Sequence, residues 1–196
     1  MEHEYRENLV VYGKKLLETG LVQGTYGNLS VRQDERSMLV TPSGLDYAGL
    51  QPKDMVKVNL ETLVWEGSLR PTSEKGLHGE IYRVRRDVGA VIHTHSKYCA
   101  IFAAARKDVP IEDVKVQETF GKMVKLAAYA LPGSEELWTH TLEALGENNG
   151  CIMASHGMLC VGKTLKDAFA NCCMLEDYCS KYIESRWKAG GSNGII

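Results

Sequence analysis

Two histidines separated by one residue give the strongest chemical signal in the sequence. His93 and His95 follow the short apolar run 90–92, which predicts a β-strand. Residues two apart in a strand project from the same face, so the two imidazoles are expected side by side. Zinc binds imidazole nitrogens at about 2 Å, and such a pair supplies two ligands. The spacing alone leaves a second interpretation open, in which both histidines only form hydrogen bonds at a strand end.

A third histidine lies between two further strand-like runs. His156 occupies the turn 155–157, with the apolar segments 151–154 before it and 158–161 after it. A strand–turn–strand unit brings its ring to a sheet edge, where it would complete a three-imidazole zinc site with one position open to substrate. A histidine in such a turn is by itself usually an ordinary polar residue. Imidazoles also bind manganese, cobalt and iron, so another divalent metal is an alternative to Zn2+.

Two glutamates are candidates for acid–base chemistry. Glu74 opens a predicted helix after Thr72 and Ser73, a position where the helix dipole favours a carboxylate. Near a dication it could be a metal ligand or a base, and the alternative is a helix-terminal acid without a chemical role. Glu118 has no evident helical partner and is a weaker candidate for a second acid–base group.

Three polar segments beside glycines carry hydroxyl, amide and backbone N–H donors of the kind that bind phosphate. They are Gly-Thr-Tyr-Gly-Asn at 24–28, Thr-Pro-Ser-Gly at 41–44 and Thr-Ser at 72–73. Each alone resembles an ordinary turn. None matches a nucleotide P-loop or a dinucleotide fingerprint, which argues against a nucleotide ligand.

The other histidines and the cysteines are expected to have structural roles. His78 lies one helical turn after Glu74 and could face the same site, although a solvated helix position is the simpler expectation. His3 and His140 are expected at the surface. The six cysteines lack the spacing of a secreted disulfide framework, so they are expected to be reduced and buried.

Helices and strands alternate along the chain and must position these residues. Amphipathic or capped runs predict helices, and short apolar or alternating runs predict strands. The helices are expected at 7–18, 74–86, 96–105, 134–147 and 164–187, and the strands at 28–32, 38–41, 55–60, 89–95, 114–116, 126–130, 151–154 and 158–161. Several connections are too short for parallel crossovers, which favours one α/β domain over 1–196 with a mainly antiparallel sheet. The glycine-rich tail 190–194 is expected to be mobile.

Composition argues against several classes of protein. The chain has 196 residues, of which 44% are apolar and 24% charged, as in ordinary globular domains. A formal net charge of -2 offers no argument for nucleic acid binding. No run approaches the roughly 18 apolar residues of a membrane span, and the first residues lack the apolar core of a secretory signal. We expect a cytoplasmic protein that binds neither nucleic acid nor membrane.

In this order, the polar and histidine-bearing segments resemble the class II aldolase and adducin-head family, with the nearest likeness to its L-fuculose-1-phosphate aldolases. The likeness extends over residues 5–187. It is carried by the segments 24–30, 41–44, 72–74, 93–95 and 155–157, together with 132–134 and the closing helix.

The resemblance implies a three-layer α/β/α fold around a largely antiparallel sheet, assembled as a homotetramer with active sites between subunits. By motif, it makes His93, His95 and His156 the zinc ligands. Glu74 would be the catalytic acid–base and also a possible metal ligand in the resting state. The substrate phosphate would be held by Thr25, Asn28, Ser43, Gly44, Thr72 and Ser73.

The reaction implied by the resemblance belongs to carbohydrate metabolism. A zinc-dependent aldolase of this family cleaves a ketose 1-phosphate to dihydroxyacetone phosphate and an aldehyde through a metal-stabilised enediolate. Pentulose-5-phosphate 4-epimerase, sugar-acid phosphate decarboxylase and thiosugar-phosphate dehydratase are alternatives of the same fold. A non-catalytic, adducin-like cytoskeletal module is disfavoured by the histidines and Glu74. The fuculose enzymes handle the aldehyde with tyrosines that segment 111–119 and the chain after Tyr182 lack, where Glu118 is a candidate substitute.

Overall fold

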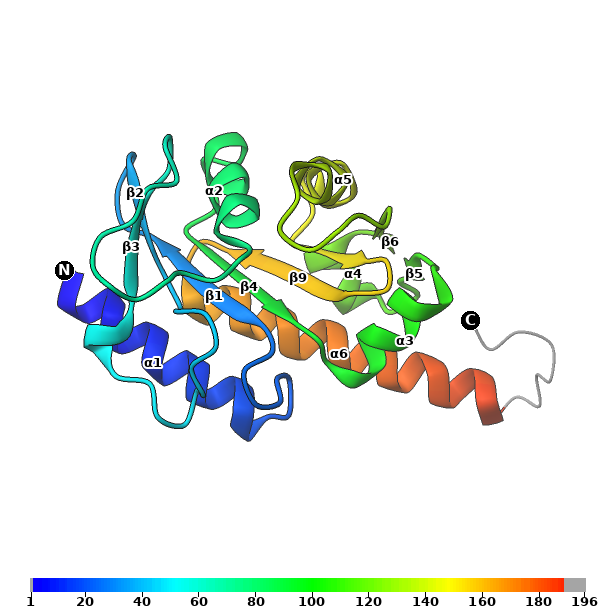
Figure 1. The fold of residues 1–196 in the computed structure, drawn as a ribbon. Coiled ribbons are helices and arrows are strands. Elements are labelled where there is room, and N and C mark those ends of the chain that lie inside the picture. Colours follow the sequence, from blue (N-terminus) through cyan, green and yellow to red (C-terminus); the bar gives the residue numbers. More distant parts are fainter. Residues whose placement is uncertain (1, 189–196) are drawn as a thin grey trace.

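A seven-stranded sheet forms the centre of the molecule (Figure 1). The computed structural model describes residues 2–188, so the predicted mobile tail 190–194 lies outside the described residues. Across the sheet the strands are β3 (Val56–Asn59), β2 (Ser37–Val40), β1 (Asn28–Arg32), β4 (Ala90–Thr94), β9 (Gly157–Gly162), β8 (Gly150–Met153) and β7 (Leu126–Ala127). Among the strands of the described residues, only β7 and β8 pair in parallel, which confirms the prediction of a mainly antiparallel sheet.

Helices cover both faces of the sheet, and this confirms the three-layer arrangement. One face carries α1 (Glu2–Glu18), α3 (Lys97–Ala105) and α6 (Leu165–Lys188), and the other carries α2 (Lys75–Val84) and α5 (Glu135–Leu145) (Figure 1). Alternate residues of β4 enter the two cores, with Ile92 on the α6 side and Val91 on the α2 side. His93 is two residues after Val91, so its side chain points to the same face of the sheet, toward α2. None of the helices within residues 2–188 has both the length and the apolar character that crossing a membrane requires.

The predicted strand at 114–116 is wrong, because these residues begin helix α4 (Val114–Phe120). Val114 and Val116 have high strand propensity, but the carboxylate of Asp113 accepts hydrogen bonds from the N–H groups of Lys115 and Val116 and caps a helix. Of the strand predicted at 126–130, only the first two residues form a strand, β7. The sequence signals also missed the short pair β5 (Val109–Pro110) and β6 (Met123–Val124) and the 3-10 turn η1 (Pro52–Asp54).

The solvated position predicted for His78 is wrong as well. His78 shares the buried face of α2 with Tyr82, and both side chains meet Ser30 of β1, whose Oγ lies 2.7 Å from His78 Nδ1 and 2.8 Å from the Tyr82 hydroxyl. Burial lowers the pKa of His78 to about 4, so the ring is neutral. The apolar residues on the same face of α2 are buried in the core, and they bury His78 with them although its side chain is polar. His3 is exposed as predicted, whereas His140 is half-buried.

The prediction of buried cysteines is confirmed for five of the six, whereas Cys173 is only half-buried. All six thiols are free. Cys151 and Cys160 lie in the buried strands β8 and β9, and Cys172 lies on the buried face of α6. Burial raises the pKa of Cys151 beyond the range in which a thiolate forms at neutral pH. These residues act as small apolar groups in the core.

A tight backbone contact fixes the start of β9 against the end of β4. A Cβ added to Gly157 would lie 2.3 Å from the carbonyl oxygen of Thr94, and backbone atoms there cannot move without breaking the strand pair. Gly157→Ala is therefore expected to lower the free energy of unfolding by about 1–3 kcal/mol. Urea denaturation followed by circular dichroism measures this. Gly49→Ala is the matched control, because its Cβ would meet only Asp46 O at 3.8 Å; equal losses in both variants would contradict the contact.

Candidate functional site

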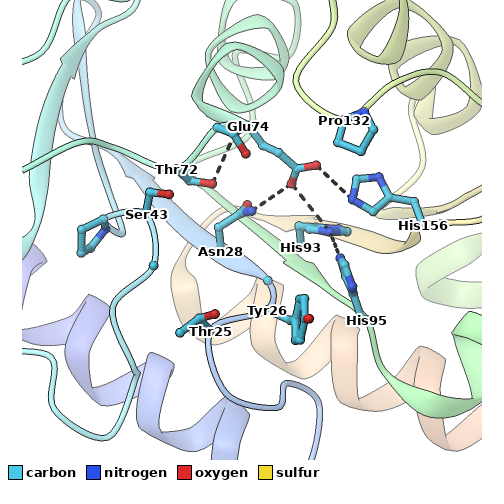
Figure 2. Close-up of a pocket in the computed structure, with 14 residues that line it drawn as sticks. Thr25, Tyr26, Asn28, Ser43, Thr72, Glu74, His93, His95, Pro132 and His156 are labelled. Atoms are coloured by element: carbon cyan, nitrogen blue, oxygen red, sulfur yellow. Dashed lines mark hydrogen bonds and ion pairs between the residues drawn. The ribbon is translucent and has the colours of Figure 1, made fainter.

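Three imidazoles converge at the C-terminal end of the central strand β4. His93 lies in β4 one residue before its end, His95 follows the strand, and His156 comes from the turn between β8 and β9 (Figure 2). Their ligand-type nitrogens all lie within 4.8 Å of one another, and the Nε2 atoms of His93 and His95 are 2.8 Å apart. The two strand histidines and the turn histidine, predicted from separate parts of the sequence, thus form one cluster.

The turn that carries His156 is held by hydrogen bonds on both sides. The N–H of His156 donates to Met153 O at 3.0 Å, and the N–H of Ser155 donates to Ala103 O of α3 at 2.9 Å. Ser155 adopts a left-handed conformation with φ of 55°, which is uncommon for a residue with a side chain. The bonds to Met153 and Ala103 keep it there and direct His156 back over β4.

The hydrogen bond of His93 determines which of its nitrogens is available. His93 Nδ1 lies 2.8 Å from Met158 O, and because a carbonyl only accepts, Nδ1 is the donor and Nε2 keeps its lone pair. Burial lowers the pKa values of His93 and His95, and it lowers that of His156 to about 4. All three rings are therefore neutral at neutral pH, the form that binds a metal ion.

Glu74 lies against this cluster at the N-terminal end of α2. Its Oε1 is 3.2 Å from His156 Nε2, its Oε2 is 3.6 Å from His93 Nε2, and Asn28 Nδ2 donates to Oε2 at 2.9 Å (Figure 2). The residue is only 3% exposed. Burial by itself raises the pKa of Glu74, but the charges that His93 and His156 carry when protonated at low pH, together with the Asn28 amide, outweigh it and lower the pKa to about 2. Glu74 is thus a buried carboxylate that is ionised at neutral pH.

The polar segments predicted to bind phosphate line the same cleft, which has a volume of about 170 Å³. All six predicted residues are present: Thr25, Asn28, Ser43, Gly44, Thr72 and Ser73. Figure 2 shows Ser43 and Thr72 on the side away from His95 and His156. Among the described residues that line the cleft, none is a lysine or an arginine. Within this chain, an anion bound there would be held by hydroxyls, amides and backbone N–H groups.

One residue predicted for the site is absent from the cleft, and two residues that line the cleft were not predicted from the sequence. Glu118 is exposed on α4 and does not line the cleft of its own chain. Tyr26 and Pro132 do line it. Tyr26 could have been found from its place inside the segment 24–28, between two predicted phosphate-binding residues. Pro132 carries no chemical signal in the sequence, because only the fold brings its loop beside His156.

The cluster has the donor set of a metal site with a base beside it. Three neutral imidazoles with one buried carboxylate match the ligands that divalent transition metals prefer. Glu74 Oε1 and Asn28 Oδ1 are buried without a hydrogen-bond partner, which is costly unless a ligand contacts them. Both atoms are acceptors, so the site suits a cation or a hydroxyl-bearing ligand.

Comparison with known proteins agrees with this chemistry. The family model of the class II aldolase and adducin N-terminal domain matches residues 7–183. A Rhodospirillum rubrum 5-methylthioribulose-1-phosphate/5-deoxyribulose-1-phosphate aldolase is 37% identical over 177 residues, which cover 90% of this chain and 79% of the relative. An Escherichia coli L-fuculose phosphate aldolase is 31% identical over 154 residues, 79% of this chain and 71% of the relative.

Solved structures show the same fold. An L-fuculose 1-phosphate aldolase superposes with a TM-score of 0.90 at 32% sequence identity and covers 98% of this chain and 90% of its own. The family match extends over nearly all of the described residues, and the relatives cover most of the chain. The chain therefore belongs to the class II aldolase and adducin N-terminal domain family and is a lyase of the aldolase class.

Proposed function

We propose that this protein is a metal-dependent aldolase that cleaves a ketose 1-phosphate to dihydroxyacetone phosphate and an aldehyde. The observation that carries the proposal is the division of one cleft, with three imidazoles and Glu74 at one end and uncharged phosphate-type donors at the other. A deoxyketose 1-phosphate suits it best, since two relatives are named for 5-deoxyribulose 1-phosphate and others for L-fuculose phosphate.

We propose zinc as the metal, held by His93, His95 and His156, with Glu74 as a further ligand when no substrate is bound. The neutral rings, the free Nε2 of His93 and the unpartnered Glu74 Oε1 support this assignment. Another divalent ion would fit the same donors. When bound, the metal supplies Lewis-acid stabilisation of the negative charge that develops on the substrate oxygens.

Glu74 is the acid–base residue of the proposed reaction. When the C3–C4 bond breaks, the C4 hydroxyl gives up its proton to a base and becomes the aldehyde, and the electron pair stays with the dihydroxyacetone phosphate part. Glu74, after taking up a proton from solvent, delivers it to that carbon. In the reverse direction Glu74 removes the same proton. Asn28 orients the carboxylate through Oε2, and the N-terminal end of α2 stabilises its negative charge. Oε1 remains free of a hydrogen bond to take the proton.

We also propose the homotetramer with interfacial active sites that the family resemblance implies. An exposed apolar side chain next to the lining residue Pro132, Leu131, supports a contact there. Glu118 lies outside its own cleft, so it could take the C4 hydroxyl proton only in the cleft of a neighbouring copy. Sedimentation velocity that finds a monomer would contradict the assembly.

The six free thiols support a cytoplasmic location, which recovery in a secreted fraction would contradict.

Removal of the metal or of one ligand should abolish the reaction. EDTA treatment and His93→Ala are each expected to lower kcat/KM for cleavage roughly a hundredfold or more, because several kcal/mol of charge stabilisation are lost. Metal content by mass spectrometry and dihydroxyacetone phosphate release are measured together. His140→Ala is the control, since His140 lies on α5 outside the cleft. Cleavage that survives both treatments would exclude the metal mechanism.

Glu74→Gln should separate metal binding from proton transfer. The amide keeps the shape of the side chain but cannot take up the proton, so solvent deuterium exchange into dihydroxyacetone phosphate is expected to slow roughly 10²–10⁴-fold. The three histidines should still retain metal. Glu80→Gln, on the same helix, pairs with Arg83 outside the cleft and serves as the matched control. Exchange at the wild-type rate in Glu74→Gln would remove Glu74 from the proposed role.

A further inference from the structure

Tyr26 is an exposed aromatic residue at the wall of the cleft. Its ring stacks on that of His95, with 5.7 Å between centroids and 27° between ring planes. The side chain is 64% exposed even though it lines the cleft. One part of the ring thus contacts a proposed metal ligand, and much of the remainder is open to a bound molecule.

The backbone after Tyr26 is fixed directly to the strand that carries the histidines. Gly27 has a φ of 90°, and a Cβ added to it would lie 2.7 Å from the carbonyl oxygen of His93 and 2.9 Å from Val22 Cγ1. Only glycine permits this conformation together with such a close approach. Asn28, the next residue, pairs with His93 in the register of β1 and β4. Tyr26 is therefore held in place beside the histidines.

The layout of the cleft determines which part of a substrate reaches Tyr26. Figure 2 shows Ser43 and Thr72 on one side of Glu74 and the histidines on the other. Suppose that a ketose 1-phosphate binds with its phosphate among the hydroxyls and its C2 and C3 oxygens at the histidines. Its C4 and later carbons must then extend past the histidines. Figure 2 places Tyr26 beside His95 and Pro132 beside His156 in that region.

The chemistry of these two flanking residues favours apolar groups. An aromatic ring and a proline ring present carbon surface, and with the histidines neutral, Glu74 is the only charged side chain among the described residues that line the cleft. We propose that Tyr26 contacts the substrate beyond C4 and selects ketose 1-phosphates with an apolar end there, such as a methyl or methylthio group. This inference rests on the aldolase function proposed above and assigns its aldehyde specificity to Tyr26.

Aldol addition tests the proposal with one constant and one variable substrate. Dihydroxyacetone phosphate is kept saturating, and kcat/KM is measured for acetaldehyde, (methylthio)acetaldehyde and the hydroxylated glycolaldehyde. In Tyr26→Ala the preference for the two apolar aldehydes over glycolaldehyde is expected to fall roughly 10- to 100-fold, the range for apolar contacts in a specificity pocket. Tyr26→Phe keeps the carbon surface and should retain the preference.

A matched control and a second measurement separate the possible failures. Trp187→Ala removes another highly exposed aromatic side chain, near the end of α6, and should keep the wild-type preference. Deuterium exchange into dihydroxyacetone phosphate needs no aldehyde. Wild-type protein without exchange would overturn the aldolase function and this inference with it. Wild-type exchange combined with an unchanged aldehyde preference in Tyr26→Ala would overturn the role of Tyr26 alone.

Discussion

The whole site depends on how closely two neighbouring segments approach the end of β4. Gly157 meets the carbonyl oxygen of Thr94 and Gly27 meets that of His93, in both cases at distances that leave no room for a Cβ. Because both contacts are made by backbone, the strand carrying two histidines cannot shift relative to the turn carrying His156 or to the loop carrying Tyr26. The same strand pairing sets Asn28 opposite His93. Backbone contact, more than side-chain packing, therefore brings the functional groups together.

Electrostatics adds a second constraint. A buried carboxylate is costly unless its charge is compensated, and Glu74 obtains compensation from Asn28 and from the N-terminal end of α2. The neighbouring imidazoles are kept neutral by burial, so they present lone pairs and no competing charge. Behind them, His78, Ser30 and Tyr82 form a hydrogen-bonded group under the same helix. This arrangement leaves one buried negative charge beside a set of neutral donors, which favours a cation.

Much of this architecture was readable in the sequence, and the failures have physical causes. Apolar periodicity located the strands that flank His93 and His156, because those strands are long and buried. The two-residue strands β5 and β6 are too short to show any period, and the cap at Asp113 reversed the strand preference of Val114 and Val116. At the site, polar and titratable residues could be proposed from their chemistry. Pro132, whose ring has no reactive group, needed the fold, and so did the exposure of Tyr26 and its stacking on His95.

The absence of lysine and arginine from the described lining of the cleft has a consequence for the working conditions of the protein. Under the proposed assignment, a doubly negative phosphate is held by directional hydrogen bonds from neutral groups. Attraction between exposed opposite charges weakens as the ionic strength rises, because dissolved ions screen it, whereas short hydrogen bonds inside a cleft are much less affected. A neutral binding surface also attracts free inorganic anions less strongly at long range. Substrate capture would then vary little between dilute buffer and the salt concentration inside a cell.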